Sequence, residues 1–146
     1  MKKFTKLASV LMAAAMAVTA FAGCGNTSTS STGSADGAIK IGGIGPLTGA
    51  AAIYGQAVKN GASIAVEEIN AKGDLKFDLK FEDDENDAEK SVNAYNNLKD
   101  WGMQVSLGSV TTQPCIAVST EVNADGIFAL TPSASSTDVL GGQPDK

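Results

Sequence analysis

The chain has 146 residues, a formal net charge of −5, two cysteines and no histidine. Without a cluster of basic residues to neutralise phosphates, a nucleic-acid-binding surface is excluded. Because histidine is the commonest general base and a frequent metal ligand, its absence also argues against acid–base and metal chemistry. The length suits one ordinary domain.

Residues 1–23 have the pattern of a bacterial export signal. Three lysines precede an uncharged, alanine-rich stretch over 7–21, which is shorter than the roughly 20 apolar residues of a membrane span. Two small residues then precede Cys24, as in a lipobox, although Phe21 stands where leucine is usual. We therefore predict a lipoprotein signal peptide, with the mature protein anchored by a lipid on Cys24 to the outer face of the cell membrane or in the periplasm. The alternative is an ordinary signal peptide with a chance cysteine.

Residues 24–38 are predicted to be a flexible linker behind the lipid. The stretch consists mainly of glycine, serine and threonine, and it has too few apolar side chains to offset the entropy of ordering. A disordered linker without an anchor is the alternative. If Cys24 is acylated, only Cys115 remains and no internal disulfide can form. We interpret Cys115 as a small helix residue rather than a nucleophile.

From residue 39 onward, strand patterns alternate with helix patterns. Strands are expected at 39–44, 75–81, 105–108 and 127–130, and helices from 54 or 55 to 70, from an Asp87 cap onward, and from about Pro114 to Ala124. This order predicts an α/β fold with a parallel sheet and right-handed crossovers. The strict alternation of 75–81 favours an edge strand, and the apolar run 127–130 favours a central one.

In an open parallel sheet, ligands bind beyond the carboxyl ends of the strands. The loop after the first strand, 45–49, contains two glycines. A Rossmann fingerprint fails, because Thr48 stands where the third glycine belongs, and there is no Walker A motif. Nucleotide binding is therefore not expected. The alternative to a binding loop is a plain strand-to-helix turn.

The loops after the third and fourth strands carry many hydroxyl groups. In 108–114 they stand directly before a helix, whose first N–H groups lack partners and attract a negative charge, so this loop suits a carboxylate. The alternative is that Thr112 or Gln113 only caps the helix. The hydroxyl and carbonyl groups of 131–138 could accept hydrogen bonds from an ammonium group. The alternative is that the segment is a generic polar loop.

The acidic run 82–87 raises the question of a metal site. An EF-hand loop starting at Asp83 needs glycine and glutamate at its sixth and twelfth positions, which are Ala88 and Ala94. We therefore predict a solvated acidic turn in which Asp87 caps the next helix, and no metal.

The three loops together resemble a known family. The segments GPLTG…YG, LGSVTTQP and FALTPSASS, behind a lipoprotein signal, are similar to the substrate-binding proteins for leucine, isoleucine and valine of ABC uptake transporters. The resemblance covers residues 39 to 140. It implies a periplasmic-binding-protein type I fold, of which residues 39–146 are a partial, truncated N-terminal lobe without the second lobe. It also implies an amino-acid ligand, permease subunits as partners and no cofactor.

The resemblance also implies which residues touch the ligand. Tyr54 would pack on it, and Ser109 would bind its α-carboxylate through the hydroxyl and the backbone N–H. In the fourth loop, Ser133 would offer a carbonyl to the ammonium group and Ser135 a hydroxyl, with Ala134 between them. In the family the second lobe supplies the carboxylate that pairs with the ammonium group, and it is missing here.

An enzyme is not expected, because the three loops lack a titratable pair and the chain has no G-x-S-x-G motif. Two other classes stay open. One is the ligand-sensing ectodomain of a receptor, which would share these loops but lack a lipobox. The other is a binding protein for amides, urea-like solutes or peptides.

Overall fold

The computed structural model describes residues 37–141. The predicted signal peptide, Cys24 and nearly all of the predicted linker lie outside these residues. Over 37–141, no helix combines the length and the apolar character that crossing a membrane requires.

The described chain alternates strands and helices in the predicted order. The strands are β1 (Ile39–Gly45), β2 (Phe77–Asp83), β3 (Val105–Leu107) and β4 (Phe128–Leu130), and the helices are α2 (Ala52–Lys72), α3 (Ala88–Trp101), α4 (Thr112–Asp125) and the short 3₁₀ helix η1 (Thr137–Leu140). All strand pairs are parallel, in the order β2-β1-β3-β4. The predicted α/β fold with a parallel sheet is confirmed.

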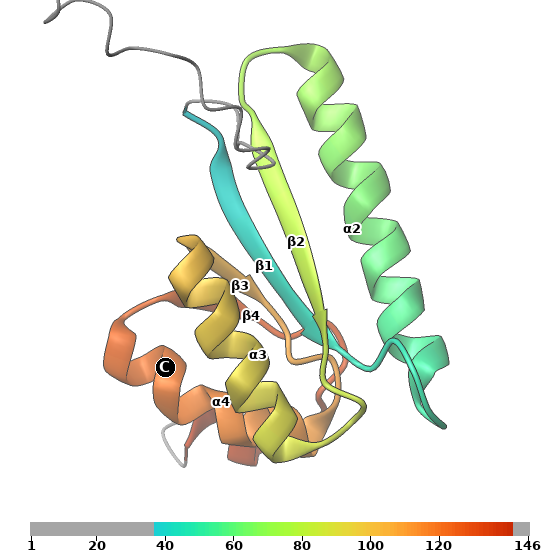
Figure 1. The fold of residues 1–146 in the computed structure, drawn as a ribbon, viewed down its shortest axis with the longest axis vertical. Coiled ribbons are helices and arrows are strands. Elements are labelled where there is room, and N and C mark those ends of the chain that lie inside the picture. The colour runs from blue at the N-terminus through green and yellow to red at the C-terminus, as the bar shows by residue number, and fades with distance from the viewer. Residues whose placement is uncertain (1–36, 142–146) are drawn as a thin grey trace, which may run out of the picture. The chain divides into compact units, whose positions relative to one another are not determined.

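The helices cover the two faces of the sheet separately. Helix α2 packs on β1 and β2 on one face, whereas α3 packs on the other face and against α4 (Figure 1). The chain moves outward from β1 to β2, then crosses back past β1 to β3 and moves outward again to β4. The order of strands therefore reverses between β1 and β3, which is where open parallel sheets bind ligands.

The predicted start of the helix after Asp87 is confirmed, whereas α2 runs two residues past its predicted end at residue 70. The Asp87 side chain accepts a hydrogen bond from the Lys90 N–H at 2.9 Å and so caps α3. Helix α2 ends at Gly73, whose φ of 91° is easy for glycine and unfavourable for other residues.

Helix α4 begins earlier than predicted. Its N-cap residue is Thr111, and no side-chain cap hydrogen bond is present at this end. The alternative, that Thr112 or Gln113 only caps the helix, is therefore wrong, because both residues already belong to its first turn. The first N–H groups of α4 are left for other partners.

Strand β2 begins at Phe77 rather than at the predicted Leu75. The Asn70 side chain binds Phe77 twice, accepting from its N–H at 2.8 Å and donating to its carbonyl at 2.9 Å. This clamp and the pairing of Phe77 with Ile39 fix where the strand starts. Leu75 stays outside, with 54% of its surface exposed.

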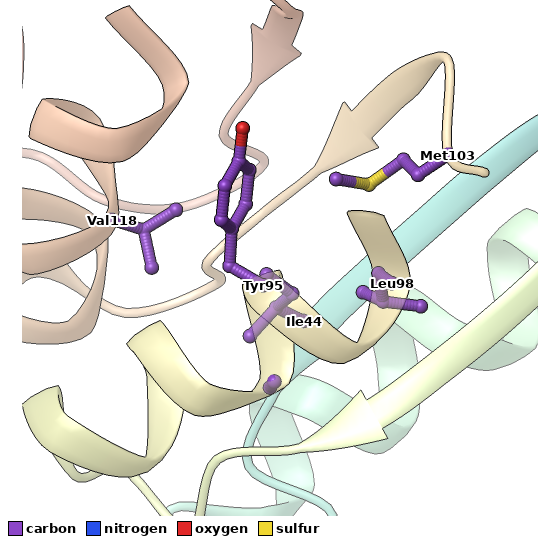
Figure 2. Close-up of a cluster of buried hydrophobic side chains, with 6 residues drawn as sticks. Ile44, Tyr95, Leu98, Met103 and Val118 are labelled. Atoms are coloured by element: carbon purple, nitrogen blue, oxygen red, sulfur yellow. The ribbon is translucent and has the colours of Figure 1, made fainter. Parts of the chain in front are cut away.

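The core lies between the sheet and the face of α3 and α4 (Figure 2). Its buried members are Ile44, Ala94, Tyr95, Leu98, Met103 and Val118, and Trp101 packs against them. The Tyr95 hydroxyl lies at one end of the core, where it donates a hydrogen bond to Asp125 Oδ2 at 3.0 Å. Tyr95 and Trp101 are therefore packing residues.

The prediction that 127–130 is a central strand is wrong for the described sheet, in which β4 lies at one edge and β2, as predicted, at the other. Apolar composition indicates that both faces of a strand are suited to burial, but it does not fix the position of the strand in the sheet. Ile127 packs against the core, so the alternation of side chains turns Phe128 and Leu130 to the opposite face. Their surfaces are 70% and 57% exposed.

We expect residues 25–146 to self-associate through this apolar face. Replacing Phe128 and Leu130 together by serine should raise the dissociation constant at least about tenfold, since burying one large apolar side chain is worth about 1.5–3 kcal/mol. Leu75→Ser, at the other end of the sheet, is the matched control. Sedimentation velocity measures the effect, and a monomeric unaltered chain with a sharp, cooperative melt would contradict the expectation.

Candidate functional site

The loops after β1, β3 and β4 meet where the carboxyl ends of these parallel strands lie side by side. This end of the sheet is here called the carboxyl edge, and it is distinct from the outer strands β2 and β4. Strand β3 lies between β1 and β4. The Val110 N–H donates to the Ile44 carbonyl at 3.1 Å, and the Gly108 N–H donates to the Leu130 carbonyl at 2.9 Å. Backbone hydrogen bonds thus connect the loop after β3 to the ends of β1 and β4.

Thr131 joins the loop after β4 to the loop after β3. Its hydroxyl donates to the Ser109 carbonyl at 2.8 Å and accepts from the Ala134 N–H at 3.2 Å. Both the Ser109 carbonyl and the Ala134 backbone are therefore held by one side chain. This places two of the predicted ligand-binding residues side by side.

The other two predicted serines of the fourth loop also contact the third loop. The Ser133 hydroxyl donates to the Val110 carbonyl at 2.8 Å, and the Ser135 N–H donates to the Thr112 hydroxyl at 3.3 Å. Ser133 and Ser135 are themselves exposed. Their contacts hold the loop backbone in place and leave the exposed surface of Ser135 at the carboxyl edge.

Ser109 is placed differently from the other predicted residues. It is fully buried, and its hydroxyl forms a hydrogen bond with the hydroxyl of Ser91 on α3, another fully buried serine. The hydroxyl predicted to face a ligand therefore faces α3. Ser109 is thus held at two points, by Ser91 at its hydroxyl and by Thr131 at its carbonyl.

Tyr54 lies in the first turn of α2, directly after the loop that follows β1, and 59% of its surface is exposed. Its neighbour Gly55 is buried, and a Cβ atom on Gly55 would collide with the Pro46 carbonyl. Gln56 adds a hydrogen bond from Nε2 to the Leu47 carbonyl at 2.9 Å. The absence of a side chain at Gly55 thus lets α2 begin close to the loop and leaves the ring of Tyr54 accessible.

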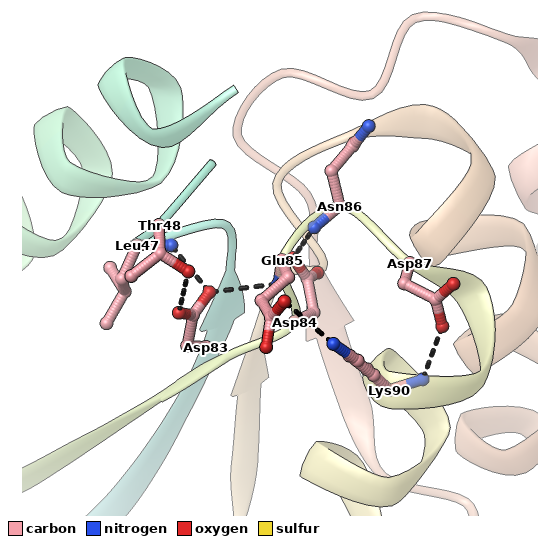
Figure 3. A network of polar contacts seen from close by, with 8 residues as sticks. All are labelled: Leu47, Thr48, Asp83, Asp84, Glu85, Asn86, Asp87 and Lys90. Atoms are coloured by element: carbon pink, nitrogen blue, oxygen red, sulfur yellow. Dashed lines mark hydrogen bonds and ion pairs between the residues drawn. The ribbon is translucent and has the colours of Figure 1, made fainter. Parts of the chain in front are cut away.

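The structure adds two residues that the sequence reasoning missed, Asp83 and Asp84 (Figure 3). Asp83 Oδ1 accepts from the Leu47 N–H at 2.8 Å, and Oδ2 accepts from the Thr48 hydroxyl at 2.7 Å. Partial burial raises the pKa of this carboxyl, but the hydrogen bonds, led by that of Thr48, outweigh it and hold the pKa below 3.8.

Asp84 is fully buried, so the predicted solvated acidic turn is wrong at this position. Desolvation raises the pKa of its carboxyl above 3.8, and the hydrogen bond from the Asn86 N–H opposes the rise. Both aspartates could have been predicted as neighbours of the site from the order of the strands. Because β2 pairs with β1 in parallel, the loop after β2 also lies at the carboxyl edge.

A cavity of about 730 Å³ lies between α4, β4 and η1. Apolar residues, among them Val118, Val122 and Leu140, supply much of its lining. This lining has little to offer the charged ends of an amino acid. The cavity therefore does not replace the three loops as the candidate ligand site.

A comparison with protein families identifies the class. Residues 38–145 match the model of the periplasmic binding protein family, so the chain belongs to this family of solute-binding proteins. Among individual relatives, it is 40% identical over 104 residues to a Leu/Ile/Val-binding protein, BraC3, of Rhizobium johnstonii, an alignment that covers 69% of this chain and 28% of that protein. It is 34% identical over 146 residues to a leucine-, isoleucine-, valine-, threonine- and alanine-binding protein of Pseudomonas aeruginosa, covering 95% and 36%.

Solved structures agree with this family. The substrate-binding protein LivJ of a branched-chain amino acid transporter from Streptococcus pneumoniae, solved in complex with isoleucine, superposes with a TM-score of 0.68 and 27% identity over 73% of this chain and 32% of that one. The predicted type I fold is confirmed. The chain spans roughly a third of the length of these relatives.

The contact between Gly55 and Pro46 can be tested by substitution. We expect Gly55→Ala to lower the free energy of unfolding by about 1–3 kcal/mol, because the backbone at Pro46 must move. Gly61→Ala in the same helix meets open space and should raise it by about 0.5–1 kcal/mol. Urea unfolding measures both, and an equal effect of the two substitutions would refute the close approach.

Proposed function

We propose that the polypeptide containing this chain captures a small amino acid outside the cytoplasm for an ABC uptake transporter, with branched-chain amino acids as the first candidates. The observation that carries the proposal is the joining of three loops, two of them rich in hydroxyl groups, at the carboxyl edge, where the strand order reverses. Membership of the periplasmic binding protein family and relatives named for binding leucine, isoleucine and valine support it.

The N-terminus of α4 is suited to the carboxylate of such a ligand. Its N-cap residue Thr111 makes no side-chain hydrogen bond to the helix, so the first N–H groups remain for an anion, which the helix dipole also favours. The Thr111 hydroxyl is buried without a partner among the described residues. Such orphaned groups call for a ligand or a water molecule.

The remaining groups have distinct roles in this proposal. The backbone N–H of Ser109 stands beside the carboxylate, while its hydroxyl is hydrogen-bonded to Ser91. The Ser133 carbonyl and the Ser135 hydroxyl receive the ammonium group, the backbone of Ala134 passes between them, and Tyr54 packs over the aliphatic part. The aligned part of this chain covers only about a third of the relatives' length. The residues that close the site from the other side and pair with the ammonium group are expected in the rest of that length.

We also propose that a lipid on Cys24 anchors the protein outside the cell membrane or in the periplasm, and that the serine- and threonine-rich linker holds the binding domain away from the surface. The permease subunits of the transporter would be its protein partners. Two properties of the sequence support this arrangement, namely the lipobox-like end of residues 1–23 and the composition of the linker.

The anchor predicts a change of location on substitution. Cys24→Ser should move the protein from the membrane fraction of the native host to a soluble fraction, because no thiol remains to accept the lipid. Cys115→Ser is the control and should leave the protein in the membrane fraction. Immunoblots of fractionated cells report both, and an unaltered protein found only in the soluble fraction would exclude the anchor.

The ligand is tested by isothermal titration calorimetry on the full-length polypeptide encoded by the gene. The panel contains leucine, isoleucine, valine, alanine and threonine, with acetamide and urea to represent amide-like solutes. Saturable binding of at least one amino acid supports the proposal. Binding of the amides alone, or of no panel member, would reject it.

The site residues are tested on the same protein. Ser135→Ala should weaken amino-acid binding at least about tenfold, since hydrogen bonds to charged groups contribute about 1.5–3 kcal/mol. Ser109→Ala should weaken it as well, because the hydrogen bond to Ser91 that holds the Ser109 backbone in place is lost. Ser119→Ala is the control, because that hydroxyl donates within α4 to the Ile116 carbonyl at 2.7 Å. Unchanged affinity in both site variants would remove these residues from the site.

A further inference from the structure

The loop after β1 is held from the end of a different strand. We propose that Asp83, the last residue of β2, is a positioning residue of the binding site, which sets the place of the Tyr54 ring by holding the loop 46–51 that leads into α2. The inference rests on the proposed function for its consequence on affinity. The part that concerns the order of the loop stands on hydrogen bonds alone.

Three hydrogen-bond donors converge on the Asp83 carboxylate (Figure 3). Its Oδ1 accepts from the N–H groups of Leu47 at 2.8 Å and Glu85 at 2.9 Å, and its Oδ2 accepts from the Thr48 hydroxyl at 2.7 Å. In the register of the sheet, Asp83 lies opposite Gly45, the last residue of β1. The carboxylate therefore joins its own turn to the neighbouring loop directly beyond the two paired strands.

The same loop is held from the other side by α2. Gln56 Nε2 donates to the Leu47 carbonyl at 2.9 Å, so the N–H and the carbonyl of Leu47 both have side-chain partners, from two different elements. Gly55 lies against the Pro46 carbonyl, where a Cβ atom would collide. Tyr54 directly precedes these two contacts in the chain, and its position therefore follows that of the loop.

Helix α2 does not fix its own start. Its N-cap residue is Ala51, and the described residues supply no side-chain cap hydrogen bond at this end. The turn is closed by backbone bonds, from the Ala52 N–H to the Gly49 carbonyl at 3.3 Å and from the Tyr54 N–H to the Ala51 carbonyl at 3.1 Å. A helix start without a capping side chain is less stable. Asp83 thus supplies, from β2, a restraint that a cap residue would otherwise provide.

The core does not require this contact. Thr48, Gly49 and Ala50 are exposed, so ordering the loop buries little apolar surface, whereas it costs conformational entropy. A turn that only connects β1 to α2 can remain loose with little effect on stability. An ordered turn is useful where the following ring must be in place before a ligand arrives, because that entropy is then not lost on binding. This difference favours a role in the site.

The first experiment measures amide hydrogen exchange of the ligand-free, full-length polypeptide. Asp83→Ala should speed exchange over residues 47–54 at least about tenfold, because hydrogen bonds to a charged group are lost. Exchange over residues 60–72 of the same helix should stay unchanged. Asp78→Ala is the matched control, since Asp78 lies near the other end of β2, opposite Lys40. It removes the same charge and should alter neither segment.

Asp83→Asn separates the geometry of the side chain from its charge. The asparagine oxygen can accept both backbone N–H groups, and its amide nitrogen can donate to the Thr48 hydroxyl, which also accepts. Asp83→Asn should therefore keep the exchange over 47–54 and the amino-acid affinity within about threefold of the natural values, whereas Asp83→Ala should weaken binding at least about fivefold. Equal losses of affinity in the two variants would mean that the charge itself acts on the ligand, and would overturn the positioning role.

A double-mutant cycle tests whether the effect on affinity passes through Tyr54. Asp83→Ala should weaken amino-acid binding at least about fivefold in the natural background and less than about twofold in the Tyr54→Ala background, because the ring that it positions is then absent. Asp78→Ala should change the affinity in neither background. Equal losses from Asp83→Ala in both backgrounds overturn the action through Tyr54.

The outcomes also separate this inference from the proposed function. If the natural protein binds no panel member, the proposed function fails, and the exchange data still decide whether Asp83 orders the loop and the first turn of α2. Unchanged exchange over residues 47–54 in Asp83→Ala, or a uniform increase over the whole domain, overturns the inference whether or not an amino acid binds.

Discussion

The parallel pairing of β1 with β2 on one side and β3 on the other is the interaction on which the rest of the structure depends. It sends the connections of β1 and β3 to opposite faces of the sheet, with α2 on one and α4 on the other (Figure 1). It also brings the ends of all four strands to one edge. Four turns that are far apart in the sequence thereby become neighbours.

At the carboxyl edge, side-chain hydrogen bonds connect neighbouring loops, as backbone hydrogen bonds connect neighbouring strands inside the sheet. Thr131 and Ser133 bind carbonyls of the third loop, and Asp83 binds the backbone of the first. Short polar side chains suit this task because they satisfy backbone groups that no neighbouring strand can reach. Some of the hydroxyl groups that could bind a zwitterion therefore form hydrogen bonds within and between the loops. Ser109 illustrates the point, since its hydroxyl contacts Ser91.

The described domain is well packed on one face and open on the other. The cluster around Tyr95 and Leu98 closes the face of α3 and α4, whereas Phe128 and Leu130 on the opposite face are largely exposed. Helix α2 covers only β1 and β2 there. Exposure of large apolar side chains to water is unfavourable. The relatives, of which this chain covers about a third, have additional chain with which such a face can be covered.

The sequence by itself determined the order of elements, the parallel sheet, the Asp87 cap and the three loops, because periodicity, capping and turn residues are local properties. It misplaced β4 and overlooked Asp83 and Asp84, since the position of a strand in a sheet and the neighbours of a carboxylate depend on residues far away in the chain. In the sequence, Asp84 is one of a run of acidic residues and is expected to be solvated. In the folded sheet, Asp84 is fully buried, and its N–H donates to the Gly45 carbonyl at the end of β1.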